Sequence, residues 1–182
     1  MGKTAVIFPG VGYTKDRPLL YYAGKQAVRN GYELMFIDFG GIEWSKEKLK
    51  DHDFLQKTLE YCLKITEDRL KSAGDLHDKE VLFISKSIGT VVATAYARKM
   101  NINTRHICFS PLEMIEGYIK EGSGILVYGD ADPYADHTAI EKIGHDLGLK
   151  MYCVHGGNHS LETGEPLTDI DNLKDIISAV FA

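Results

Sequence analysis

The segment that decides the fold is Val81-Leu82-Phe83-Ile84-Ser85-Lys86-Ser87-Ile88-Gly89-Thr90. It begins as a continuous apolar run of strand length and passes directly into a helical pattern that starts at Ile88. A run that is apolar at successive positions is typical of a parallel strand buried on both faces. The segment therefore predicts a β-strand, a sharp turn at Ser87 and an α-helix.

Runs of the same kind recur along the chain, at Thr4 to Phe8, Glu33 to Ile37, His106 to Phe109, Gly124 to Tyr128 and Met151 to Val154. Helical patterns alternate with them, and we expect helices at Asp16 to Gly31, Ser45 to Ala73, Ile88 through Tyr96, Leu112 to Lys120, Ala135 to Leu147 and Ile170 to Phe181. This alternation predicts an α/β fold, a doubly wound and mostly parallel sheet of about six strands with helices on both faces. We expect one domain over residues 1–182, with its functional residues at the carboxyl ends of the strands.

Composition narrows the classes of partner. The 182 residues are 44% hydrophobic and 26% charged, which is ordinary for a globular protein, and the formal net charge is -5. Because no basic cluster could neutralise phosphates, we expect no nucleic-acid partner. Nothing resembles a bilayer-spanning segment or a secretion signal, so we expect no membrane association. The oligomeric state is left open.

The cysteines bear on the cellular compartment. Cys62, Cys108 and Cys153 are odd in number and lie inside apolar runs, where a thiol behaves as a small hydrophobic group. We expect all three to be reduced and the protein to be cytoplasmic.

Ser87 is the candidate nucleophile. A serine exposed at a strained strand-to-helix turn needs small residues two positions before and after it, and Ser85 and Gly89 meet that need. The turn resembles the Gly-x-Ser-x-Gly nucleophile elbow of the α/β-hydrolase superfamily, with Ser85 in place of the first glycine. Ser85 is the rival nucleophile, although we expect it inside the buried strand end.

Two later loops carry the same resemblance. Tyr128-Gly129-Asp130-Ala131-Asp132-Pro133 is similar to the acid loop of that superfamily, which implies that Asp132 orients the base, with Asp130 and Asp136 as competitors. His155-Gly156-Gly157-Asn158-His159-Ser160-Leu161 is similar to its histidine loop, which implies that His159 is the base. We expect no metal at the two histidines, because the glycines between them disfavour a helix and no third ligand is evident.

The loop after the first run, Phe8-Pro9-Gly10-Val11-Gly12-Tyr13, resembles the oxyanion-hole loop of the superfamily, with Pro9 in place of a histidine. The resemblance implies backbone N–H donors at Ile88 and at Val11 or Gly12. The same stretch lacks the third glycine of a dinucleotide fingerprint, since Lys15 stands there, and we expect no cofactor. The substrate pocket is expected to include Gly10, Tyr13, Lys86, Leu112 and Tyr134, with Lys86 exposed.

These motifs occur in the order Ser87, Asp132, His159, as in α/β-hydrolases, and small serine hydrolases of the dienelactone-hydrolase type are the nearest resemblance. Only Ser110 to Ser123 separate two predicted strands where larger members insert a lid, so we expect no lid domain and a shallow site. The resemblance implies hydrolysis of a small ester or thioester through an acyl-enzyme, with a small-molecule acyl substrate as partner. Acyl transfer, carbon–carbon bond hydrolysis and a non-catalytic binding role remain open.

Overall fold

The centre of the fold is a parallel β-sheet, seen in a computed structural model that describes residues 2–40, 42, 48 and 52–182. Within these residues, six strands pair in the order β2-β1-β3-β4-β5-β6, all of them parallel. Their bounds are β1 (Gly2–Phe8), β2 (Glu33–Phe36), β3 (Lys79–Lys86), β4 (Thr104–Phe109), β5 (Gly124–Gly129) and β6 (Lys150–Val154). Every predicted strand is therefore present, most of them one or two residues longer than expected.

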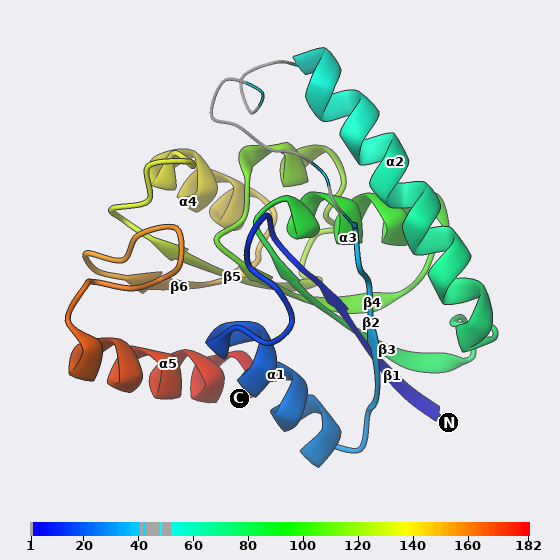
Figure 1. Ribbon diagram of the computed structural model, residues 1–182, viewed down its shortest axis with the longest axis horizontal. Helices are drawn as coiled ribbons and strands as arrows, with labels where there is room; N and C mark the ends of the chain where they lie inside the picture. The colour runs from blue at the N-terminus through cyan, green and yellow to red at the C-terminus, as the bar shows by residue number, and fades with distance from the viewer. Residues whose placement is uncertain (1, 41, 43–47, 49–51) are drawn as a thin grey trace.

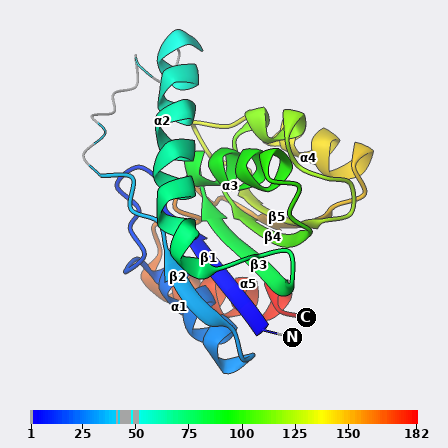
Figure 2. The ribbon, with the colours of Figure 1, turned by 90° about the vertical axis from the view of Figure 1, so that its right-hand side faces the viewer.

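Helices cover both faces of this sheet, as predicted (Figures 1 and 2). The face that carries α1 and α5 lies opposite the face that carries α2, α3 and α4. The bounds are α1 (Pro18–Arg29), α2 (His52–Leu70), α3 (Ile88–Lys99), α4 (His137–Asp146) and α5 (Pro166–Val180), with short 3-10 helices η2 (Lys71–Ala73) and η3 (Glu113–Gly117).

The strands are apolar at successive positions because each face has its own hydrophobic core. On β3, Phe83 packs into the cluster shared with α2, α3 and α4, whereas Leu82 and Ile84 pack into the cluster shared with α1 and α5. Side chains alternate between the two faces of a strand, so both faces must be apolar when both are covered.

Several helix bounds differ from those predicted. The helix α5 begins at Pro166, a turn before Ile170, and proline is well suited to a first helical turn. The segment expected as a helix over Leu112 to Lys120 forms only the 3-10 helix Glu113–Gly117. The predicted start of α2 at Ser45 lies outside the described residues.

The structure bears on two expectations from the sequence, those about membrane-spanning segments and about the cysteines. No helix in the described ranges combines the length and apolar character that crossing a membrane requires. Cys62 and Cys108 are free and buried, whereas Cys153 is free and half-buried.

Candidate active site

Ser87 is the single residue between β3 and α3, and its backbone has the positive φ expected of an elbow, with φ 55° and ψ -127°. Such a conformation is unfavourable for a residue other than glycine. The N–H of Ser87 donates to the carbonyl of Phe109 at 3.0 Å, which helps to hold the turn in this conformation.

The residues that flank Ser87 explain how the turn fits against β1. A Cβ placed on Gly89 would lie 2.5 Å from the carbonyl oxygen of Pro9, so only glycine allows α3 to pass this close. Ser85 is fully buried, and its Oγ donates to the carbonyl of Ile107 at 3.1 Å. The rival nucleophile therefore lies inside the sheet, as expected.

Ser87, His159 and Asp132 form one hydrogen-bonded row. Nε2 of His159 lies 2.8 Å from Oγ of Ser87, and its Nδ1 lies 2.7 Å from Oδ2 of Asp132. A neutral imidazole with its proton on Nδ1 satisfies both contacts, since Nδ1–H then donates to the carboxylate and Nε2 accepts from the hydroxyl. The side chain of Asp132 is only 3% exposed, and its Oδ1 accepts a hydrogen bond from the N–H of Tyr134 at 2.9 Å. The structure thus brings together the three residues chosen from the motifs.

The competing acids have other partners. Asp130 accepts from Gly156 N–H and contacts His155, and the His155 contact is the main reason that the pKa of Asp130 lies below its ordinary value. Asp136 caps the N-terminus of α4 by accepting from Thr138 N–H at 2.9 Å.

His155 and His159 contact different carboxylates, so they do not make the ligand pair that their spacing could suggest. Among the described residues, Asp130, Cys153 and His155 form a group whose ligand atoms lie within 4.8 Å of one another. The contact between Asp130 and His155 already pairs two of these three side chains.

The loop after β1 forms a tight turn against the elbow. Gly10 and Tyr13 exchange backbone hydrogen bonds, and Gly12 between them has a φ of 65°. These bonds leave the N–H groups of Val11 and Gly12 without a partner in the described part of the chain. The N–H of Ile88 is in the first turn of α3, where helices have unpaired donors. Their role as oxyanion donors stays a prediction.

A cavity of about 160 Å³ opens beside Ser87 and His159. Of the predicted pocket residues, Tyr13 and Lys86 line it, together with the turn residues Val11 and Gly12. The charged side chains of Arg17 and Glu162 also line it, and the sequence offered no motif that would find them.

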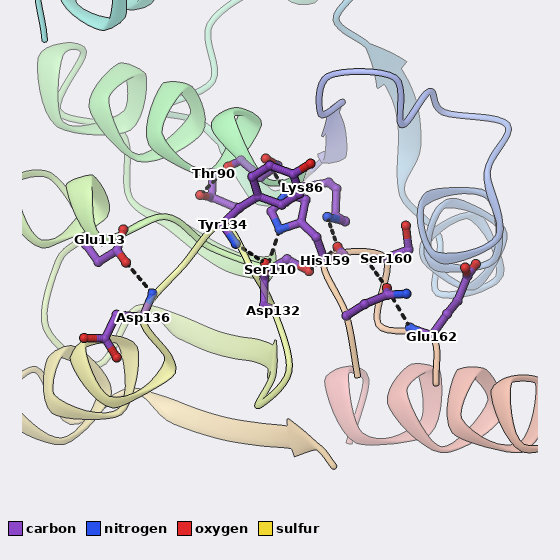
Figure 3. A network of polar contacts seen from close by, with 12 residues as sticks. Lys86, Thr90, Ser110, Glu113, Asp132, Tyr134, Asp136, His159, Ser160 and Glu162 are labelled. Carbon is purple, nitrogen blue, oxygen red and sulfur yellow. Dashed lines mark hydrogen bonds and ion pairs between the residues drawn. The ribbon is translucent and has the colours of Figure 1, made fainter. Parts of the chain in front are cut away.

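A larger cavity, of about 330 Å³, shares Val11 and Gly12 with the first one. Gly10, Ile88 and the apolar side chains of Phe36, Phe39 and Ile42 line it. The other predicted pocket residues line neither cavity. Leu112 is half-buried against the core, and the Tyr134 ring packs against the His159 imidazole with centroids 5.0 Å apart (Figure 3).

Lys86 corrects one sequence-based expectation. It is 1% exposed rather than solvent-exposed, because it is the last residue of β3 and its side chain lies beneath the turn at Gly10 and Tyr13. Burial lowers the pKa of this lysine to about 7, although the nearby carboxylates of Asp132 and Glu162 act in the opposite direction.

Comparisons with known proteins support the fold. No protein-family model and no curated protein matches the sequence. Solved structures that match include an α/β serine hydrolase homologue from Coxiella burnetii (14% identity, TM-score 0.67, covering 98% of this chain and 85% of that one). A serine hydrolase without a lid from Xanthomonas campestris matches with 14% identity and a TM-score of 0.69, covering 97% of this chain and 78% of that one.

A third similar structure is Est1E from Butyrivibrio proteoclasticus with ferulic acid bound (13% identity, TM-score 0.68, covering 99% of this chain and 90% of that one). At such low identity the likeness shows the fold alone. The chain has the α/β-hydrolase fold, and the predicted fold class is confirmed.

Proposed function

We propose that the chain is a serine hydrolase that cleaves a small ester or thioester through an acyl-enzyme intermediate. The observation that carries this proposal is the hydrogen-bonded row of Ser87, His159 and Asp132, which begins at a strained elbow. The presence of α/β serine hydrolases among the similar structures supports the same reaction class.

In the first half of the reaction, Oγ of Ser87 attacks the acyl carbon while Nε2 of His159 takes the hydroxyl proton. The carbonyl oxygen becomes an oxyanion, which accepts hydrogen bonds from the N–H of Ile88 and from that of Val11 or Gly12. Asp132 keeps the Nδ1 proton in place and stabilises the imidazolium. Collapse of the intermediate breaks the bond to the leaving group, which receives the proton from Nε2.

In the second half, water attacks the acyl-enzyme and His159 accepts its proton. Collapse of the second intermediate breaks the bond between the acyl carbon and Oγ of Ser87, and the proton returns to that oxygen. The products are a carboxylic acid and the free enzyme.

Two features support a small substrate. The connection between β4 and β5, Ser110 to Ser123, contains only the 3-10 helix η3, which is too short to cover a long acyl chain. The cavity beside Ser87 is about 160 Å³, and the second cavity, at about 330 Å³, is at the lower end of the range for drug-sized ligands. The similar structure without a lid, from Xanthomonas campestris, agrees with an uncovered site.

Labelling with a fluorophosphonate probe tests this proposal directly. The probe phosphonylates an activated serine, so we expect stoichiometric modification of the full chain and a modified peptide that contains Ser87. The Ser87→Ala variant is the negative control, and heat-denatured protein controls for nonspecific reaction. An unlabelled native protein would favour a non-catalytic binding role instead.

A further inference from the structure

Lys86 has an unusual position for a lysine, because its side chain is almost entirely removed from solvent. Transfer of an ammonium group from water into a protein interior is costly unless the group finds good partners. Lys86 follows Ile84 by two positions in β3, so it points toward the face of the sheet that carries α1 and α5. Its side chain lies beneath the turn at Gly10 and Tyr13 and lines the inner part of the cavity beside Ser87.

The ammonium group contacts the two loops that flank Ser87. Nζ donates a hydrogen bond to the backbone carbonyl of His159 at 2.5 Å (Figure 3). It also lies 5.2 Å from the centroid of the Tyr13 ring. Tyr13 closes the turn that carries the candidate oxyanion donors, and its own Oη accepts from Leu19 N–H. One side chain therefore links the elbow, the histidine loop and the turn after β1.

The histidine loop has hydrogen bonds of its own and further bonds to the neighbouring segments at Lys86 and Ser110. Asn158 organises the loop internally, since its side chain accepts from Ser160 N–H and its carbonyl accepts from Leu161 N–H. The carbonyl of His159 is instead held from outside, by Lys86 and by the hydroxyl of Ser110 at 2.9 Å. These two donors fix the backbone from which the imidazole projects toward Ser87.

We infer that Lys86 is a positioning residue, which holds the backbone of His159 and the ring of Tyr13 so that the imidazole and the oxyanion donors meet at Ser87. This inference rests on the proposed function, because it assigns a purpose to that alignment. Small displacements of a reacting group cost large factors in rate. A buried lysine with a lowered pKa also reduces the stability of the fold at neutral pH, so its presence here is better explained by alignment than by stability.

The test is the Lys86→Met variant, which keeps an unbranched apolar side chain as far as Cε but removes the Nζ donor. We expect kcat to fall about 10- to 100-fold with little change in KM, because alignment and not binding is lost. We expect the melting temperature to stay the same or rise, because a buried charge has been replaced by an apolar group.

The matched control is Lys79→Met, since Lys79 lies at the opposite end of β3 and its Nζ donates to the backbone carbonyl of Ala73 at 2.7 Å. This variant removes the same kind of hydrogen bond far from Ser87, and its kcat should equal that of the wild type. Equal kcat losses in both variants would mean that any lysine-to-carbonyl bond in β3 matters, which contradicts the inference.

A readout that does not depend on turnover is the low-field proton NMR signal of the hydrogen bond between Nδ1 of His159 and Asp132. We expect this signal to shift or broaden in Lys86→Met and to stay unchanged in Lys79→Met. An unchanged signal with wild-type kcat would overturn the inference, and so would an unfolded or strongly destabilised Lys86→Met protein. If Ser87 proves unreactive, the proposed function fails, whereas the NMR comparison still decides the role of Lys86.

Discussion

The carboxylate of Asp130 lies 2.9 Å from Nδ1 of His155, which makes a second aspartate–histidine pair beside the pair of Asp132 and His159. The side chain of His155 is 88% exposed, whereas that of His159 is 23% exposed. The Asp130 pair joins the loops that follow β5 and β6, and we interpret it as a structural contact between them.

Asp132 contacts the histidine that reaches Ser87, whereas Asp130 contacts His155, so the amide variants of the two aspartates should differ in activity. Asp132→Asn should lower kcat about 10⁴-fold, because the imidazole is left in the wrong tautomer. Asp130→Asn should keep most of the wild-type kcat. Steady-state kinetics with p-nitrophenyl acetate measures both, and equal losses would move the orienting role to Asp130.

The two serines of the elbow should also differ. Ser87→Ala should lose several powers of ten in kcat while the circular dichroism spectrum stays unchanged, since residues of such a row act as a unit. Ser85→Ala should lose far less, because its hydroxyl is turned into the sheet and donates to Ile107. The reverse order of the two losses would show that the nucleophile is Ser85.

Substrate length provides a further prediction. The connection from Ser110 to Ser123 is short and no lid is expected, so most of a long acyl chain should stay in solvent. Such a chain loses conformational freedom on binding without gaining buried contacts. We predict that kcat/KM is highest for short chains in a series of p-nitrophenyl esters from acetate to palmitate. A steady rise of kcat/KM toward palmitate would contradict the proposal of an uncovered site.

His106 makes stability depend on pH. Its ring is buried, Nδ1 has no partner among the described residues, and burial lowers its pKa to about 4. Below the ordinary histidine pKa of about 6.5, the unfolded chain binds a proton that the native protein excludes. Stability is therefore lost as the pH falls from about 6.5 to about 4, by about 2 kcal/mol between pH 7 and pH 5.

Urea unfolding of the wild type and of His106→Leu at pH 7 and pH 5 isolates this contribution from that of the carboxylates. The wild type should lose about 2 kcal/mol more free energy of unfolding than the variant over this interval. Parallel losses in the two proteins would mean that His106 is protonated in the native state.

The positions of the strands were predicted well from the sequence, whereas several bounds of the helices were not. Each strand is covered on both faces, so its composition alone indicates its environment. The start of α5 was placed four residues late, at Ile170, although Leu167 lies three residues before Ile170 at helical spacing. The proline at position 166 was the available signal.

The candidate site was predictable where a motif fixes both a residue and its turn, as at Ser87 and His159. The burial of Lys86 was not predictable. The alternation of side chains along a strand gives the direction of a side chain at the strand end, but not which residues cover it. Tyr13 covers it, from a loop distant in the sequence. Arg17 and Glu162 reach the cavity in the same way.

Positions 85 and 89, on either side of the elbow, differ in the space that each has for a side chain, so they should differ in the substitutions that they tolerate. Every substitution of a glycine adds a Cβ, and position 89 has no space for one. Position 85 already carries a side chain whose hydroxyl has found an acceptor in the neighbouring strand. We therefore expect sequence variants of this protein to differ at position 85 and to retain glycine at position 89.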